Sequence, residues 1–92
     1  MAHVTTNSAK LLARVRRIRG QVEAVERALG GEVDCAQVLQ QIAAVRGAIN
    51  GLMAEVIEDH IRTHVAGPAI EGEAHRMQGA EELIDVIRAY LK

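Results

Sequence analysis

The stretch of residues 35–64 constrains the fold of this chain more than any other part. It contains no proline, and one set of large apolar residues recurs along it at steps of four and three: Val38, Ile42, Val45, Ile49, Leu52 and Val56. This spacing places an apolar seam along one side of an α-helix. Other apolar and small residues form further lines beside the seam, and a helix that is apolar on several sides must be covered by more than one neighbour. The stretch therefore predicts a long helix inside a helical bundle.

The residues before this helix repeat its pattern. A second seam with the same steps consists of Leu11, Val15, Ile18, Val22, Val25 and Leu29. Gly30 and Gly31 form a strong helix stop and turn after it. Asp34 followed by Gln37 has the pattern of a capping box at the start of the long helix. We therefore expect the first two helices to form an antiparallel hairpin with coiled-coil-like packing.

A third helix is expected after a linker. Gly67 and Pro68 end the long helix near Val65, because proline cannot continue a helix. Apolar residues then lie on one side of a helical segment over about residues 74–91, and no strand pattern occurs in the sequence. The sequence predicts an all-α fold of three helices in a single domain, residues 1–92. Its core of small aliphatic residues is of a kind that often gains stability from oligomerisation.

Metal-ligating side chains lie at both ends of the long helix. Cys35 begins it, and His60 and His64 lie near its end on the same helical face. Thiolate and imidazole suit Zn, Ni, Co or Cu, and the spacing of the histidines lets both reach one ion. One straight helix separates Cys35 from His60 by about 38 Å. A second copy running antiparallel would bring the Cys35 end of one chain beside the histidines of the other.

The N-terminus supplies two more candidate donors. Met1 precedes the small residue Ala2, so removal of Met1 would expose the Ala2 amine beside His3. An amine, its neighbouring amide and an imidazole together chelate late first-row metals. The alternative to a metal site is ordinary: a lone cysteine acts as a small hydrophobe and helical histidines face solvent. His75 is expected on the surface, apart from this set.

Basic residues gather on the first helix. No acidic residue lies between Ser8 and Gly20, whereas the basic residues there are Lys10, Arg14, Arg16, Arg17 and Arg19. Arginine donates paired hydrogen bonds to phosphate, and Arg46 from the long helix is expected to join the same surface. This surface could neutralise DNA phosphates. A solvated helix face is the competing interpretation, because the sequence has no helix-turn-helix spacing, zinc-finger pattern or aromatic stacking platform.

Several other classes of protein are excluded or disfavoured. A single cysteine rules out an intrachain disulfide and indicates a reducing compartment. No signal peptide and no apolar run of about 20 residues is visible, so we expect a cytoplasmic protein without a membrane partner. Cys–His catalysis needs a third, orienting group and a substrate pocket. The sequence suggests neither, so an enzyme is not expected.

Three segments resemble the CsoR/RcnR/FrmR family of all-helical metal- and formaldehyde-sensing repressors. They are RVRRIRGQVEAVERAL at 14–29, CAQVLQQIAAVRGAINGLMAEVIEDH at 35–60 and RAYLK at 88–92. The resemblance implies three-helix protomers that pair into a four-helix-bundle dimer and then into a dimer of dimers. It implies binding to operator DNA in the effector-free state and release on binding effector. It also implies that Cys35 of one subunit meets His60 and His64 of the partner.

The branch of the family is a narrower question. The copper sensors have a cysteine at the position of His64, which argues against Cu(I). The nickel/cobalt branch resembles His-Cys-His-His, and His3, Cys35, His60 and His64 match it, although Zn(II) could fit the same donors. The formaldehyde branch has proline after Met1 and no histidine at the position of His64. Here residue 2 is alanine, and both departures favour a metal.

Two functions are therefore expected as alternatives. The first is a Ni(II)- or Co(II)-responsive repressor that derepresses a metal exporter, with DNA contacts from Lys10, Arg14, Arg16, Arg17 and Arg46. The second is a formaldehyde-responsive repressor of a detoxification operon, because the first helix resembles that branch more closely. In that case formaldehyde would bridge the Ala2 amine and the Cys35 thiol.

Overall fold

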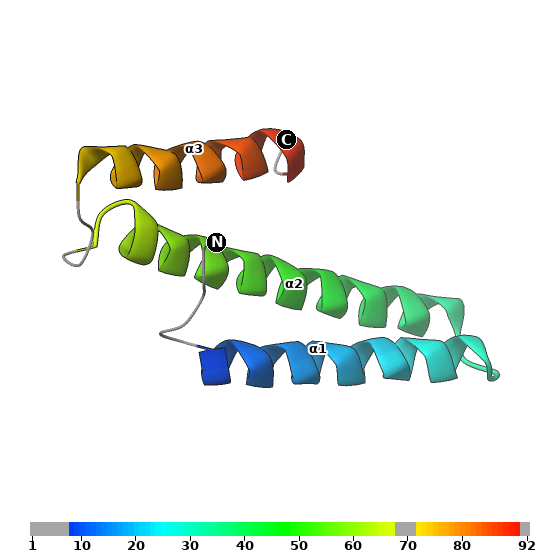
Figure 1. The fold of residues 1–92 in the computed structure, drawn as a ribbon. Helices are drawn as coiled ribbons and strands as arrows, with labels where there is room; N and C mark the ends of the chain where they lie inside the picture. Colours follow the sequence, from blue (N-terminus) through cyan, green and yellow to red (C-terminus); the bar gives the residue numbers. More distant parts are fainter. Residues whose placement is uncertain (1–7, 68–71, 91–92) are drawn as a thin grey trace. The chain divides into compact units, whose positions relative to one another are not determined.

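A computed structural model describes residues 8–67 and 72–90 of the chain (Figure 1). These residues form three helices and no strand: α1 (Ser8–Leu29), α2 (Cys35–His64) and α3 (Glu73–Tyr90). The predicted all-α class is confirmed, and the helix ends lie close to those expected from the glycines and the proline. The described residues divide into two compact units, 8–54 and 55–90.

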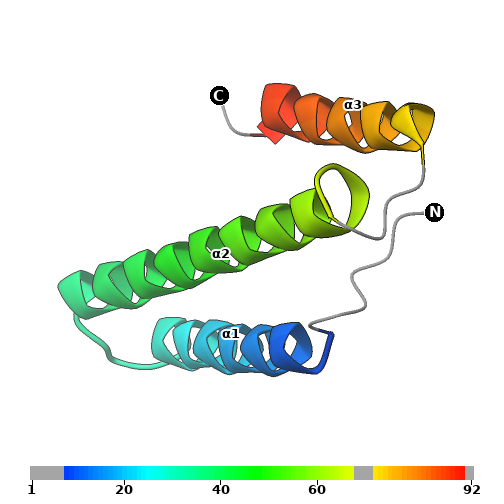
Figure 2. The same cartoon turned by 90° about the vertical axis from the view of Figure 1, so that its left-hand side faces the viewer.

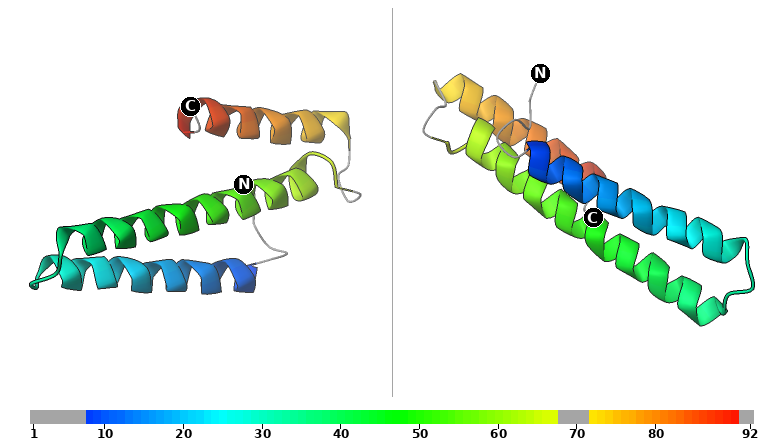
Figure 3. Two further views of the ribbon diagram at one scale, coloured as in Figure 1. Left: turned by 180° about the vertical axis from the view of Figure 1, so that it is seen from behind. Right: turned by 90° about the horizontal axis from the view of Figure 1, so that it is seen from below.

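The first unit is a helical hairpin. α1 and the first part of α2 lie side by side and run antiparallel (Figures 1 and 3), as predicted. Its buried apolar residues are Leu11, Ile18, Ala28 and Val38. Val45 and Leu52 are half-buried. One neighbouring helix covers only part of a broad apolar stripe. Only some of the apolar residues of each helix are therefore buried between α1 and α2.

The predicted seams are wrong in one respect: several of their members face outward. Val15 and Val22 of α1 are 44% and 48% exposed, and the buried stripe of α1 is rotated towards Val25 and Ala28. The outward apolar face, which we call the open face of the hairpin, consists of Leu12, Val15, Val22, Leu29, Leu39, Ile42 and Ile49. Two helices cannot bury both sides of such wide stripes, so this face needs a further partner.

α1 ends and α2 begins at the glycine and the aspartate that the sequence indicated. The Gly30 amide donates to the Glu26 carbonyl at 3.1 Å, which completes the last turn of α1. At the start of α2 the Asp34 carboxylate accepts a hydrogen bond from the Ala36 amide at 3.2 Å. This bond satisfies one of the amides left free at a helix N-terminus and confirms Asp34 as the N-cap.

The second unit joins the end of α2 to α3, which runs back beside it (Figure 2). The Ile61 carbonyl accepts hydrogen bonds from the amides of Val65 and Ala66, and α2 ends there. Gly67 is buried, and a side chain at this position would collide with the Arg62 carbonyl oxygen. Gly72 has a φ of 82°, which glycine adopts readily, immediately before α3 begins. Glycines therefore lie at the end of α2 and directly before α3.

Candidate functional site

His60 and His64 lie on consecutive turns near the end of α2. Their ring centroids are 5.0 Å apart, with the ring planes tilted by 47°. Both side chains are partly buried; that of His60 is 16% exposed. The sequence prediction that these two imidazoles share one face of α2 is confirmed. Two neighbouring imidazoles of this kind can serve one metal ion.

A hydrogen bond to α3 fixes the His60 ring. Its Nε2 lies 2.8 Å from the carbonyl oxygen of Gly79. A carbonyl only accepts hydrogen bonds, so Nε2 carries the proton and Nδ1 of the neutral ring keeps its lone pair. The Glu82 carboxylate lies 4.0 Å from the same nitrogen. Partners of this kind orient metal-binding histidines and select which nitrogen faces the metal.

Gly79 makes this contact possible because it has no side chain. It is buried within α3, and a Cβ there would collide with the His64 carbonyl oxygen and lie 2.8 Å from the His64 Cβ. α3 therefore approaches the end of α2 at the distance of backbone contact. The sequence reasoning missed Gly79 and Glu82; a glycine in the interior of a helix was the available signal for Gly79.

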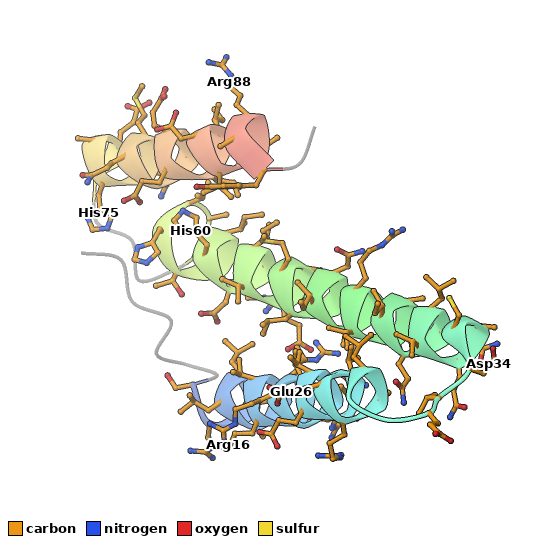
Figure 4. The ribbon with its side chains drawn as sticks, turned by 90° about the vertical axis from the view of Figure 1, so that its right-hand side faces the viewer. Arg16, Glu26, Asp34, His60, His75 and Arg88 are labelled. Carbon is orange, nitrogen blue, oxygen red and sulfur yellow. The ribbon has the colours of Figure 1, made fainter. Side chains whose placement is uncertain are left out.

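His64 is packed between two other histidines. Its ring stacks on that of His75, with centroids 6.2 Å apart and planes 11° from parallel. His64 Nε2 is buried and has no hydrogen-bond partner among residues 8–67 and 72–90. His75 is exposed, as predicted, but it does not lie apart from the other histidines (Figure 4). An unpartnered buried nitrogen costs about 1–3 kcal/mol, which makes His64 a candidate for a ligand or a partner.

Cys35 is the first residue of α2, and its side chain is exposed as a free thiol. α2 is continuous from Cys35 to His64, so thiol and imidazoles lie at opposite ends of one helix. Within the two described ranges no three His, Cys, Asp or Glu side chains are grouped so as to hold a metal. His3 and Ala2 lie outside the described residues. A single described chain therefore does not bring the predicted ligands together.

The donors nevertheless fit a late first-row cation. They combine a thiol with imidazoles, which are the ligands that Zn(II), Ni(II) and Co(II) accept. The Gly79 carbonyl engages Nε2 of His60, which leaves Nδ1 to bind a metal, and His64 Nε2 lacks a partner among the residues that the structure describes. The second observation is the clearer one, because metal ligation would satisfy a nitrogen that the described residues leave unsatisfied.

The predicted basic residues fall into two groups. Lys10, Arg16 and Arg17 of α1 and Arg46 of α2 are exposed. Arg16 extends from the side of α1 that faces away from α2 (Figure 4). Such side chains are free to meet phosphate groups.

Arg14 differs from the others, because it is half-buried and its Nη1 donates to the Gly51 carbonyl at 3.3 Å. A Cβ at Gly51 would already touch the guanidinium, at 3.5 Å. Arg14 thus joins α1 to α2, a role that the sequence reasoning did not foresee.

No described helix is both long and apolar enough to cross a membrane.

Comparisons with known proteins agree on a single family. The family described as metal-sensitive transcriptional repressor matches residues 7–89. An uncharacterized protein encoded in the bioA 5′ region of Serratia marcescens is 55% identical over the full length of both chains. The transcriptional repressor RcnR of Salmonella paratyphi B is 42% identical, again over the full length of both.

A solved structure is similar in fold as well. It is the formaldehyde-responsive regulator FrmR of Salmonella enterica serovar Typhimurium, in a variant with glutamate replaced by histidine. The two chains are 48% identical and superpose with a TM-score of 0.83, covering 97% of this chain and 99% of that one. The family consists of transcriptional repressors, which act on DNA and are not enzymes, so the prediction of a non-enzyme is confirmed. The chain belongs to the metal-sensitive transcriptional repressor family.

Proposed function

We propose that this chain is a cytoplasmic repressor that responds to Ni(II) or Co(II) and releases its operator when the metal binds. The observation that carries the proposal is the pair of imidazoles of His60 and His64, because the buried Nε2 of His64 has no partner within the described part of the chain. Zn(II) would meet the same donors. His3 and the Ala2 amine are proposed as additional ligands from the N-terminus.

The metal centre needs two chains. The Cys35 thiol and the imidazoles are at opposite ends of α2, and the hairpin leaves an open face of large apolar side chains. An antiparallel second copy on that face would form a four-helix bundle and bury it. The same pairing would place the partner's thiol beside His60 and His64. We propose that two such dimers form the working homotetramer.

The residues of the centre have separate tasks. His60 donates its Nε2 proton to the Gly79 carbonyl, which leaves Nδ1 as the nitrogen that would bind the metal. His64 offers Nε2, which none of the described residues engages in a hydrogen bond. The metal, when bound, supplies a Lewis-acid centre that favours the thiolate form of Cys35 and fixes these side chains together. Ligation would therefore tie the end of α2 to the start of a neighbouring α2.

The exposed basic residues are proposed to contact operator phosphates. Lys10, Arg16 and Arg17 lie on α1, which begins at Ser8, a few residues after the proposed N-terminal ligands in the sequence. Recruiting the N-terminus to the metal would shift these side chains relative to the copies in the other subunits. A coupling of about 1–3 kcal/mol changes operator affinity 5–150-fold, and operator DNA must weaken metal binding equally.

The test is a binding titration on DNA from immediately upstream of the chain's own coding sequence. Fluorescence anisotropy with apo-protein should give tight, salt-sensitive binding, and Ni(II) or Co(II) should weaken it at least about fivefold. His64→Ala should bind the DNA as wild type does but should no longer respond to metal. Operator affinity that is unchanged by saturating Ni(II) and Co(II) would contradict the proposal.

A second candidate function is formaldehyde sensing, favoured by the 48% identity to a formaldehyde-responsive regulator. It requires formaldehyde to link the Ala2 amine to the Cys35 thiol, with loss of one water molecule. Intact-protein mass spectrometry would then show the gain of one bridging carbon atom, and Cys35→Ser should abolish it. His64→Ala should leave this response intact, whereas it should remove a response to metal.

A further inference from the structure

The end of α2 and the start of α3 face each other in a regular antiparallel register. His60 meets Gly79 through a hydrogen bond, and one turn further along α2 His64 meets His75 through its ring. His60 and His64 are four residues apart, and so are His75 and Gly79. Each helix therefore presents two consecutive turns to the other. The close approach at Gly79 brings the start of α3 next to the end of α2, where the His75 ring stacks on that of His64.

His75 is thus the third imidazole of a continuous cluster. Its ring is 6.2 Å from that of His64, which is in turn 5.0 Å from that of His60. The stacked rings do not direct their lone pairs to one point, and the described residues form no three-ligand group as they stand. His75 is exposed, however, and an exposed side chain changes rotamer freely. Rotation of this one ring could turn a nitrogen towards a cation that His64 would hold.

We propose that His75 is a metal ligand, supplied by α3 of the same subunit that supplies His60 and His64. The proposal rests on the metal-sensing function proposed above, and it assigns to α3 a direct bond to the divalent cation. Metal binding would then fasten the first turn of α3 to the last turns of α2. Position 75 would help to set which cation is held, because a third imidazole raises the number of nitrogen donors.

The competing role for His75 is purely structural: its ring would support His64 by stacking. Two substitutions separate the roles. His75→Phe keeps a flat ring for stacking but has no nitrogen, whereas His75→Ala removes both. Because His75 is exposed, both variants should fold. Arg76→Ala changes an exposed neighbour on α3 and serves as the control.

The experiment titrates full-length apo-protein with Co(II) against a competing chelator and records absorption and proton NMR. His75→Phe and His75→Ala should both bind Co(II) at least about tenfold more weakly, since even outer partners of a ligand contribute that much. Each should also lose one contact-shifted imidazole N–H signal that wild type and Arg76→Ala retain.

Two results would overturn the proposal, and they differ from each other. If His75→Phe matches wild type in affinity and in its N–H signals, His75 is no ligand, while the proposed function stands. If wild type itself binds no Co(II) with a thiolate charge-transfer band, the proposed function fails and the assignment of His75 fails with it.

Discussion

The hairpin of residues 8–54 and the unit of residues 55–90 are both helical pairs, but different contacts hold them. Every buried apolar side chain of the described chain belongs to the hairpin, including Leu11 and Ile18. In the second unit the buried residues of the described part are Asp59, Gly67 and Gly79. There the apolar side chains of α2 and α3, such as Ile61 and Leu83, are at most half-buried, and α3 approaches α2 at Gly79, whose carbonyl oxygen lies against His60.

This difference suggests that the hairpin provides most of the stability and that the second unit responds to the ligand. A hairpin packed by aliphatic side chains gains its stability from burial, in proportion to the apolar area removed from water. A unit whose contacts include a carbonyl, a carboxylate and stacked imidazoles can change when a ligand binds one of those groups. Regions that respond to ligands are drawn from the less stable parts of a protein. Variants of the two units, compared at one fixed protein concentration because assembly affects stability, test this contrast.

The largest effect is expected for an isoleucine in the hairpin. Ile18→Ala removes a buried side chain and should lower the free energy of unfolding by about 2–4 kcal/mol in urea titrations. The same change at Ile87 of α3, which is 42% exposed, should cost less than about 1 kcal/mol. Equal losses at the two sites would mean that the second unit has an apolar core after all.

The second effect reverses sign between the regions. Gly79→Ala forces a methyl group against the His64 backbone and should destabilise the second unit by about 1–3 kcal/mol. Gly20→Ala in α1 has nothing within 4 Å and should stabilise the helix by about 0.5–1 kcal/mol. Hydrogen exchange resolved by segment would locate each change. A stabilising Gly79→Ala would show that α3 does not approach α2 this closely.

The third effect distinguishes two arginines of α1. Arg14→Ala removes the hydrogen bond to the Gly51 carbonyl and should lower the free energy of unfolding by about 1 kcal/mol. Arg16→Ala should leave stability within about 0.5 kcal/mol. It should instead reduce the slope of DNA affinity against salt by about one ion. If Arg16→Ala leaves the salt dependence unchanged, Arg16 makes no phosphate contact.

The smallest effect is expected at the cap of α2. Asp34→Ala removes the acceptor for the Ala36 amide and should lower the free energy of unfolding by about 0.5–1 kcal/mol. Asp34→Asn should retain most of that stability, because asparagine also caps helices. Thermal unfolding followed by circular dichroism measures both. A loss of the same size in both variants would assign the effect to the charge of Asp34 rather than to the cap.

The sequence predicted the helices best where apolar residues recur periodically, and their ends where glycine, proline or a capping residue occurs. The steps of four and three predicted α1 and α2, and Gly30, Asp34 and Gly67 predicted the helix ends. The apolar patterns did not show which of their residues would be buried. An apolar stripe that is too wide for one neighbouring helix to cover does not specify where that helix packs. Val15 and Val22 therefore remain exposed within the described chain.

The site was predictable in its ligands but not in their surroundings. Spacing alone placed His60 and His64 on one face, and the helix length alone separated them from Cys35. The contacts with Gly79, Glu82 and His75 depend on how α3 returns, and no local pattern encodes that register. Arg14 was similar: its charge suggested phosphate, whereas its carbonyl partner on α2 became visible only in the fold.

The most direct test asks whether thiol and imidazoles of one site come from different chains. Cys35→Ser and His64→Ala should each lack the Co(II) thiolate band when pure. After subunit exchange, a mixed dimer has one site with both Cys35 and His64 intact, so about a quarter of the wild-type band should return. If the mixture shows no Co(II) thiolate band, as its two components show none, the site is not shared between antiparallel copies.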